Sequence, residues 1–506
     1  MKIQKRIPVI FAVCLLLTAV SATSAGAVDA KSVTSGATVE IIKDGKVIST
    51  DSYDSPVSAW KAAFAAADNT KETVITLGTD WNEDTLMTVG SGMHMTIDLN
   101  GHYIRRVRNH QMKSDGEVFK VEKHAVFTVR DSNPRGEGYD GVRGGVITGG
   151  ASGNAGGGVH IEEEGEFRLQ GGTIYDCITD ADGGAVNLEG SSMDTKFTMT
   201  GGRIYGCKTI DSANECYGGA IYMNKGTVSI SNAKIDNCYS EDDGGAIYSE
   251  RGTITLNNVV FSGNHCRERG GAIYTAHDIL KYQATVVHAY NCVFAGNEAN
   301  EDGGAVFIND NPEHDAAVLF HNCKFRNNIA RKQAGAIFIN DDNIALSGCE
   351  ITGNSAVKEG GGVYVDGRYN ITLKGKMIIK NNSSGKGQGV ANLALQDQTH
   401  GTARIINAGL YKDSEVHVGS TSDKSVLLSE WMSQYQQQYF KADKGRLTTS
   451  DYRTVETKFV TSGSLFTEGG LYAVAILGGA GVIGTAALII RQKKKKKMTQ
   501  GGEEND

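Results

Sequence analysis

The chain has 506 residues, of which 64 are Gly and only 4 are Pro, and 40% of it is hydrophobic. This composition predicts turn-rich packed structure and argues against a disordered chain. The formal net charge is −7, and because basic residues outnumber acidic ones at both termini, the chain between them is more acidic still. A nucleic-acid partner is therefore not expected, since binding phosphates needs a positive field.

Residues 1–27 have the pattern of a secretory signal peptide. Lys2, Lys5 and Arg6 precede the apolar run "VIFAVCLLLTAV", and Ala25-Gly26-Ala27 follows as a small-residue cleavage site. We expect an exported protein whose mature chain begins near Val28.

Residues 28–89 are expected to form N-terminal strands and a cap helix. Ser55-Pro56 is a helix-start signal, and the sequence after it places Trp60, Phe64 and Ala67 on one helix face. Such a helix would cover the open end of a repeat structure, where strand edges are otherwise unpaired.

Residues 90–403 contain a repeat marked by pairs of glycines, as in "GGAIYS", with successive motifs 26 to 35 residues apart. A fixed period of this length predicts a solenoid. Short alternating segments rich in β-branched residues predict several strands per repeat, and hence a parallel β-helix. The first residue of each motif is, in order, Gly156, Gly183, Gly218, Gly244, Gly270, Gly303, Ala334, Gly360 and Gly387.

Stacked coils turn equivalent positions into columns. The third residue after the first glycine, Val or Ile from Val159 to Val390, is predicted to face inward, and the fourth outward. A column before the glycine pairs should form a side-chain ladder from coil to coil. It contains Cys177, Cys207, Cys238, Asn264, Asn297, Asn328, Asn354 and Asn381. A second cysteine column contains Cys292, Cys323 and Cys349, and all six thiols are expected to be reduced and packed.

Residues 404–470 are expected to form a C-terminal cap and stalk, with a docked helix at "SEWMSQYQQQYF". Residues 471–490 are uncharged and apolar over the length needed for a transmembrane helix. The lysines of residues 491–506 predict a cytoplasmic tail, so the rest of the chain should lie outside the cell membrane.

The motif "GGAIY" paired with "FSGN" or "FAGN" resembles the repeat of the chlamydial polymorphic outer membrane proteins. More broadly, it resembles the right-handed, single-stranded parallel β-helix of pectate-lyase-like proteins. The resemblance covers roughly residues 90–400 and implies fold more strongly than activity. The chain departs from the chlamydial family at its C-terminus, where an apolar segment and lysines imply a Gram-positive-type bacterial surface.

The outward fourth position predicts a row of aromatic side chains. Rings bordered by carboxylates and amides suit sugar binding, because the C–H faces of sugars pack on rings. Alternatively, stacked rings stabilise neighbouring strands on one another. The candidate ligand-binding residues are Tyr222, Tyr248, Tyr274, Phe307, Phe338 and Tyr364.

Catalytic and metal-binding residues are less clearly indicated. Glu189 and Glu250 should lie two coils apart, about 9.6 Å, which is near the upper limit for inverting glycosidases. Chance also produces such pairs among many acids. Calcium could bind near Asp310, Asp341, Asp342 and Asp366, although Asp is also a common turn residue. No cofactor is expected. The residues just before the glycines, Asp182 among them, are interpreted as structural.

These features favour a surface-anchored, non-catalytic adhesion or binding module for polysaccharides or for host or neighbour surface proteins. A polysaccharide lyase or glycoside hydrolase on the same scaffold is one alternative, and a structural spacer is another. The fold alone does not choose among them.

Overall fold

The computed structural model describes residues 36–107, 111–210, 215–276, 285–309, 318–340, 343–366, 369–385, 390–398, 401–421, 427–443, 447–453 and 456–461. The predicted signal peptide, the apolar segment 471–490 and the basic tail lie outside these residues, as do Asp310, Asp341 and Asp342. Within the described ranges no helix has the length and apolar character to span a membrane.

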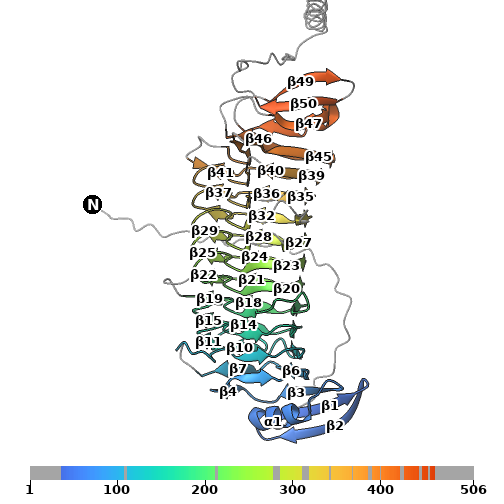
Figure 1. Cartoon of the computed structure of the whole chain (residues 1–506), viewed down its shortest axis with the longest axis vertical. Coiled ribbons are helices and arrows are strands. Elements are labelled where there is room, and N and C mark those ends of the chain that lie inside the picture. The colour runs from blue at the N-terminus through green and yellow to red at the C-terminus, as the bar shows by residue number, and fades with distance from the viewer. Residues whose placement is uncertain are drawn as a thin grey trace, which may run out of the picture. The chain divides into compact units, whose positions relative to one another are not determined.

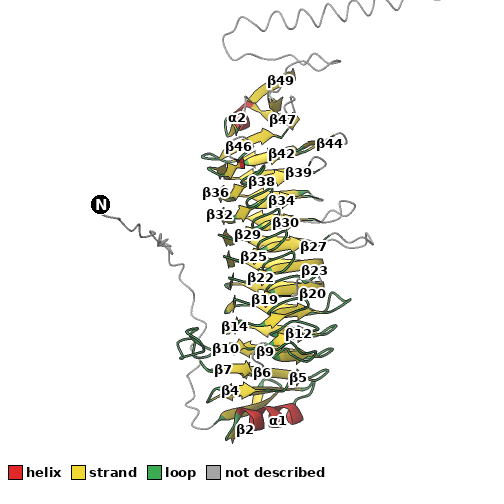
Figure 2. Ribbon diagram, turned by 90° about the vertical axis from the view of Figure 1, so that its left-hand side faces the viewer, coloured by secondary structure: helices red, strands yellow, loops and turns green. Residues whose placement is uncertain are grey.

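The fold is a parallel β-solenoid, as the repeat predicts. Figures 1 and 2 show the strands of successive turns stacked on one another. Each turn adds one strand to each of three columns, which belong to one 36-stranded sheet, and most turns add a short strand to a separate nine-stranded sheet.

The strands of each column pair in parallel. The first column contains β5 (Met87–Val89), β8 (Phe119–Val121), β12 (Val159–Ile161), β16 (Val186–Leu188), β20 (Ile221–Ser231), β23 (Ile247–Asn257), β26 (Ile273–Thr275), β30 (Val306–Ile308), β34 (Ile337–Ile339), β38 (Val363–Val365) and β42 (Leu393–Leu395). The second contains β3 (Lys71–Leu77), β6 (His94–Asp98), β9 (Val126–Arg130), β13 (Glu166–Leu169), β17 (Lys196–Met199), the second halves of β20 and β23, β27 (Thr285–Tyr290), β31 (Val318–His321), β35 (Ile344–Ser347), β39 (Asn370–Gly375) and β45 (Arg404–Leu410). The third contains β4 (Trp81–Glu83), β7 (Tyr103–Arg106), β10 (Val146–Thr148), β14 (Thr173–Tyr175), β18 (Arg203–Tyr205), β21 (Lys234–Asp236), β24 (Val260–Ser262), β28 (Val293–Ala295), β32 (Lys324–Arg326), β36 (Glu350–Thr352), β40 (Ile378–Lys380) and β46 (Glu415–Ser420). The nine-stranded sheet contains β11 (Ala151–Ser152), β15 (Ile178–Thr179), β19 (Lys208–Thr209), β22 (Tyr239–Ser240), β25 (His265–Cys266), β29 (Glu298–Ala299), β33 (Ile329–Ala330), β37 (Ser355–Ala356) and β41 (Ser383–Ser384).

The N-terminal cap consists of β1 (Ala37–Lys43), β2 (Lys46–Tyr53) and α1 (Pro56–Ala66). The helix begins where predicted, because the Ser55 hydroxyl accepts a hydrogen bond from the Ser58 N–H. The predicted buried face is only partly right. Ala59 and Ala63 are buried and Phe64 is exposed, since small residues allow α1 to lie close to β1 and β3.

The parallel ladder extends beyond residues 90–403 at both ends. β3, β4 and β5 already pair with β6, β7 and β8, and β46 pairs with β48 (Phe440–Ala442). The expected C-terminal helix is wrong for most of its length. That segment is mainly β47 (Leu427–Ser433), and α2 covers only Gln434–Gln437. β47 forms an antiparallel sheet with β49 (Leu447–Arg453) and β50 (Glu456–Thr461), and β43 (Asp397–Gln398) pairs with β44 (Gly401–Thr402).

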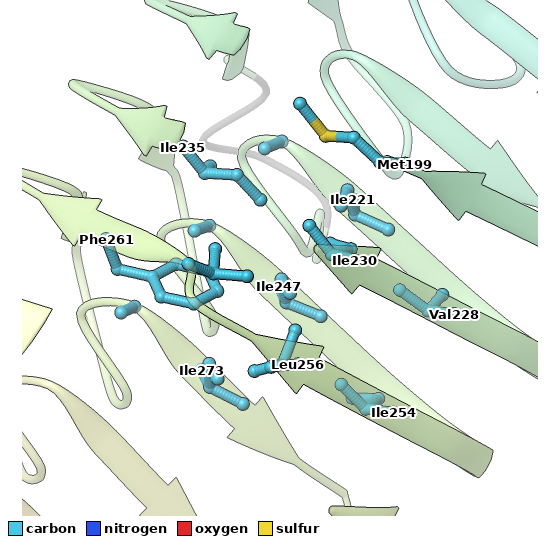
Figure 3. Close-up of a cluster of buried hydrophobic side chains, with 14 of the residues drawn as sticks. Met199, Ile221, Val228, Ile230, Ile235, Ile247, Ile254, Leu256, Phe261 and Ile273 are labelled. Atoms are coloured by element: carbon cyan, nitrogen blue, oxygen red, sulfur yellow. The ribbon is translucent and has the colours of Figure 1, made fainter. Parts of the chain in front are cut away.

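The core lies inside the coils and confirms the inward columns. Figure 3 shows Ile221, Ile247 and Ile273 from successive first-column strands in one buried cluster with Phe261 of the third column. Val390 is an exception to the predicted inward column. Leu393 pairs with Val363 in its place, so the last repeat is shifted relative to the glycine motif.

The predicted asparagine ladder is present and buried. The side-chain amide of each asparagine donates to the Oδ1 of the asparagine on the next coil, at 2.8–3.0 Å from Asn264 to Asn382. Asn382, not Asn381, continues the ladder, and Asn381 instead has a φ of 56°. Asn382 lies at the regular ladder position, because it follows Ile379 by three residues as Asn354 follows the paired Ile351.

Cys177, Cys207 and Cys238 precede Asn264 in the ladder column, and the Cys238 N–H donates to the Asn264 Oδ1. All eight cysteines of the described ranges are buried, and none forms a disulfide. Burial raises the pKa of the Cys238 thiol to about 12, so the thiolate needed for nucleophilic or metal chemistry does not form near neutral pH. These residues serve as packing groups.

The two glycines of each motif are required for different physical reasons. From Gly183 to Gly360 the first residue has a positive φ, for example 71° at Gly270, and Ala334 takes this position at 58°. The second lies against backbone, because a Cβ on Gly271 would stand 2.2 Å from the Gly304 carbonyl oxygen. The pair therefore combines a left-handed turn with close contact between coils.

Candidate binding cleft

The six aromatic residues predicted to bind ligand form one continuous stack outside the core. They pair in register along the first column, and the ring centroids of neighbours are 4.7–5.7 Å apart. Each side chain is buried, with only 3–8% of its surface exposed. The six rings are Tyr222, Tyr248, Tyr274, Phe307, Phe338 and Tyr364.

Residues from the turns help to bury this stack. Tyr217 stacks on Tyr248 with ring centroids 4.3 Å apart, and the Arg269 guanidinium lies 5.2 Å from the Tyr274 ring centroid. The prediction of exposed ring faces is therefore wrong, since each face is covered by the next ring. The arrangement matches the alternative interpretation, in which the rings hold neighbouring strands together.

A polar cleft lies where the aromatic stack ends. In the coils before Tyr222 the same register position holds Asn187, then His160, then Lys120. The cleft has a volume of about 660 Å³. Its lining consists of four carboxylates, three amides and four other residues: Glu162, Glu163, Asp182, Glu189, Asn154, Asn187, Asn224, Lys123, Gly190, Ser191 and Tyr222.

The side-chain donors of this lining already have acceptors. Tyr222 donates to Glu250 at 2.6 Å, and the Asn224 amide donates to the other oxygen of Glu250 at 2.9 Å. The Asn187 amide donates to the Asp182 carbonyl oxygen, and Ser191 donates to Glu163. The remaining donors also have partners. The Asn154 amide donates to the Ser114 carbonyl oxygen, and Lys123 forms ion pairs with Glu163 and Glu164.

Several acceptors of the lining have no partner in the described part of the chain. Asn187 is 5% exposed, and its Oδ1 is itself almost completely buried and has no hydrogen-bond partner among the described residues. One carboxylate oxygen of Asp182 accepts the Tyr217 N–H at 2.8 Å, and one of Glu189 contacts His160 Nε2 at 2.7 Å. For the second oxygen of each carboxylate, no partner is found within the described ranges.

The two carboxylates differ in protonation. Burial raises the pKa of Asp182 to about 7, against the lowering effect of the hydrogen bond from Tyr217. The hydrogen bond with His160 lowers the pKa of Glu189. Near neutral pH the cleft therefore holds one ionised carboxylate beside one that titrates.

The candidate catalytic pair is divided by this arrangement. Glu189 lines the cleft, whereas Glu250 supports it from behind through Tyr222 and Asn224. The strand register confirms that the two glutamates are two coils apart. Of the calcium candidates only Asp366 is described, and the described ranges contain no group of three His, Cys, Asp or Glu residues that could hold a metal ion.

Sequence reasoning missed Asp182 as a site residue. Its column alternates acids with other residues, and the acids accept backbone N–H groups of the next coil, as Asp302 does from Gln333 at 2.7 Å. Asp182 does the same but also lines the cleft. The interruption of the aromatic row at Asn187 and His160 was the available signal.

A second aromatic set, on and beside the third column, was also missed. Tyr103, Tyr139, Tyr175 and Tyr205 are half-buried, and the Tyr175 and Tyr205 ring centroids are 5.4 Å apart. Arg203 lies 3.8 Å from the Tyr205 ring centroid. These rings do not follow the glycine motif at a constant distance, so reading columns from that motif did not find them.

Comparison with known proteins matches one segment of this fold. The Chlamydia polymorphic membrane protein repeat matches residues 258–276, which include β24, β25 and β26. The chain is thus a parallel β-solenoid that contains a repeat of this type. No curated protein and no solved structure matches the chain.

Proposed function

We propose that this chain is a cell-surface β-solenoid protein that binds glycans in the polar cleft without reacting with them. The match to a repeat named for membrane proteins supports the surface location, together with the predicted signal peptide and transmembrane segment. The Gram-positive-type envelope stays a prediction.

The cleft is the observation that carries the binding function. Ligand sites are concave and present a few fixed polar groups, and about 660 Å³ falls within their usual range. Its carboxylates and amides come from strands and turns of stacked coils, which hold them rigidly. Ligand hydroxyl groups would donate to the free acceptors, while Tyr222 supplies the aromatic part of the wall.

A glycan array probed with the purified full chain tests this proposal. Ser191 is exposed at the cleft, so Ser191→Trp should block it and abolish binding. Lys324→Trp places the same side chain on an exposed position of β32 and should bind as the unchanged chain does. Absence of any glycan binding, or equal binding by both variants, would refute the proposal.

Hydrolysis of a glycan is a second candidate function, favoured by the different protonation of Asp182 and Glu189. Glycosidases use an acid that titrates near neutral pH together with an ionised carboxylate, and this cleft contains one group of each kind. Release of new reducing ends from a bound polysaccharide, lost in Asp182→Asn and in Glu189→Gln, would establish it. Binding without release would leave the non-catalytic function in place.

A further inference from the structure

The free polar atoms of the cleft share one chemical property. They are the Asn187 Oδ1, one carboxylate oxygen of Glu189 and one carboxyl oxygen of Asp182. The first two are acceptors, and the third is an acceptor when Asp182 is ionised. Each side-chain donor atom, in contrast, already binds at least one protein acceptor. A ligand that completes these hydrogen bonds must supply donors.

The charges of the cleft point in the same direction. Lys123 lies 3.8 Å from Glu163 and 3.3 Å from Glu164, and Lys120 lies 2.7 Å from Glu162. The cations of this region are thus neutralised by neighbouring carboxylates. Glu189 adds a negative charge whose partner is a histidine, and its side chain is 71% exposed.

The buried amide distinguishes this site from a surface cluster of acids. Asn187 is nineteen-twentieths buried, and leaving a buried acceptor unpaired is unfavourable, because the acceptor has lost its hydrogen bonds to water. Its equivalent in the next coil is Tyr222, whose hydroxyl is already paired with Glu250. A donor brought by a ligand would remove this cost, so the position fits binding better than packing.

We infer that the cleft selects glycans that carry ammonium groups, that is, amino sugars with free amines. An ammonium group has three donors and no acceptor, which matches a wall of free acceptors. Glu189 supplies the opposite charge, and Asn187 supplies a neutral acceptor. An N-acetyl group in the place of the ammonium group has one amide donor, a carbonyl acceptor and no charge, so it fits this wall less well. The inference rests on the proposed glycan-binding function.

Calorimetric titration of the full chain at pH 6 tests the inference, with glucosamine oligomers and N-acetylglucosamine oligomers of equal length. We expect at least tenfold tighter binding of the free-amine oligomer, weakening as salt is added. Glu189→Gln keeps the shape of the side chain and should remove most of this preference. Glu350→Gln removes a carboxylate that pairs with Arg326 on the third column and should leave the preference unchanged.

The outcomes separate this inference from the proposed function. Equal or tighter binding of the N-acetylated oligomer overturns amine selectivity, and the glycan-binding function survives if Ser191→Trp abolishes that binding. If the chain binds other glycans but neither oligomer, amine selectivity is likewise overturned and the glycan-binding function survives. No binding of any glycan refutes both. Thermal unfolding of each variant shows whether lost binding reflects lost structure.

Discussion

Tyr222 and Glu250 contact each other across two adjacent coils, with the phenol donating to the carboxylate at 2.6 Å. A residue expected to bind sugar and a residue expected to catalyse thus form one structural pair that supports the cleft wall. The Asn224 amide occupies the second carboxylate oxygen of Glu250.

Replacing Glu250 should therefore affect stability first. Glu250→Ala leaves the Tyr222 hydroxyl and the Asn224 amide without their acceptor, and we expect a loss of about 2 kcal/mol in the free energy of unfolding. Thermal or urea unfolding measures it. If a hydrolytic activity is found, loss of that activity in a fully folded Glu250→Gln protein would contradict this structural role.

The aromatic stack should likewise contribute to stability and not to ligand affinity. Tyr274→Ala removes a buried ring between two others, which costs about 3–5 kcal/mol. Tyr274→Phe keeps the ring and loses only the hydrogen bond that the hydroxyl accepts from Asn309, so its cost should be about 1 kcal/mol. Unfolding curves of the two variants compare these values. Loss of glycan binding in folded Tyr274→Phe would instead support direct sugar contact.

The asparagine ladder makes a specific position sensitive. Asn328 donates to the Phe294 carbonyl oxygen and to Asn354, and it accepts from Asn297. Because Asn328→Ala leaves several buried groups unpaired, we expect at least about 3 kcal/mol of destabilisation. Lys324→Ala, at an exposed position nearby, should change the free energy of unfolding by no more than about 0.5 kcal/mol. Equal effects would show that the ladder is not stabilising.

Adjacent glycines provide a matched pair of variants. Gly271→Ala would force a Cβ to 2.2 Å from the Gly304 carbonyl oxygen, so we expect it to disrupt the coil or prevent folding. Gly270→Ala would place a Cβ 2.5 Å from the Ile273 carbonyl oxygen at a positive φ. Because Ala334 occupies the equivalent position of a later coil, the coil can adjust to this side chain, and the cost should be smaller, about 1–2 kcal/mol. Expression yield and thermal midpoint distinguish the two. If Gly270→Ala were more destabilising than Gly271→Ala, the close approach of the coils at Gly271 would be contradicted.

Asp182 predicts a pH dependence of stability. Because burial raises the pKa of its carboxyl from 3.8 to about 7, the folded state holds a proton that the unfolded state has lost over this range. Its contribution to stability is therefore greatest below about pH 4 and declines until pH 7. Asp182→Asn keeps an acceptor for the Tyr217 N–H and should show a smaller fall in thermal midpoint between pH 5 and pH 8. If the thermal midpoint of Asp182→Asn falls as much as that of the unchanged chain, the pH dependence of stability comes from other groups.

Much of the architecture could be predicted because a solenoid repeats its constraints. Each coil must again provide inward apolar residues, a glycine at a left-handed turn and a ladder amide, so the period identifies the columns directly. The prediction failed where the period is broken. The shift in the last repeat places Leu393, not Val390, in the inward column, and no regular spacing indicates it. Counting back from that irregular motif also pointed to Asn381, whereas the strand register places Asn382 in the ladder.

The site was harder to predict because strand parity shows which way a side chain points, not what covers it. Tyr217 and Arg269 come from turns of neighbouring coils and help to bury rings that parity alone left exposed. Similarly, Asp182 has a structural contact like that of Asp302, and only its place beside the cleft sets it apart.

The amino-acid sequence by itself determined the parallel β-solenoid, the inward columns, the reduced cysteines and the asparagine ladder, since each follows from a local pattern repeated from coil to coil. Only the tertiary structure decided that the aromatic row is buried and that a cleft opens where the row ends. The physical reason is that burial and cavities depend on side chains from separate coils and turns, which spacing along one chain does not place in three dimensions.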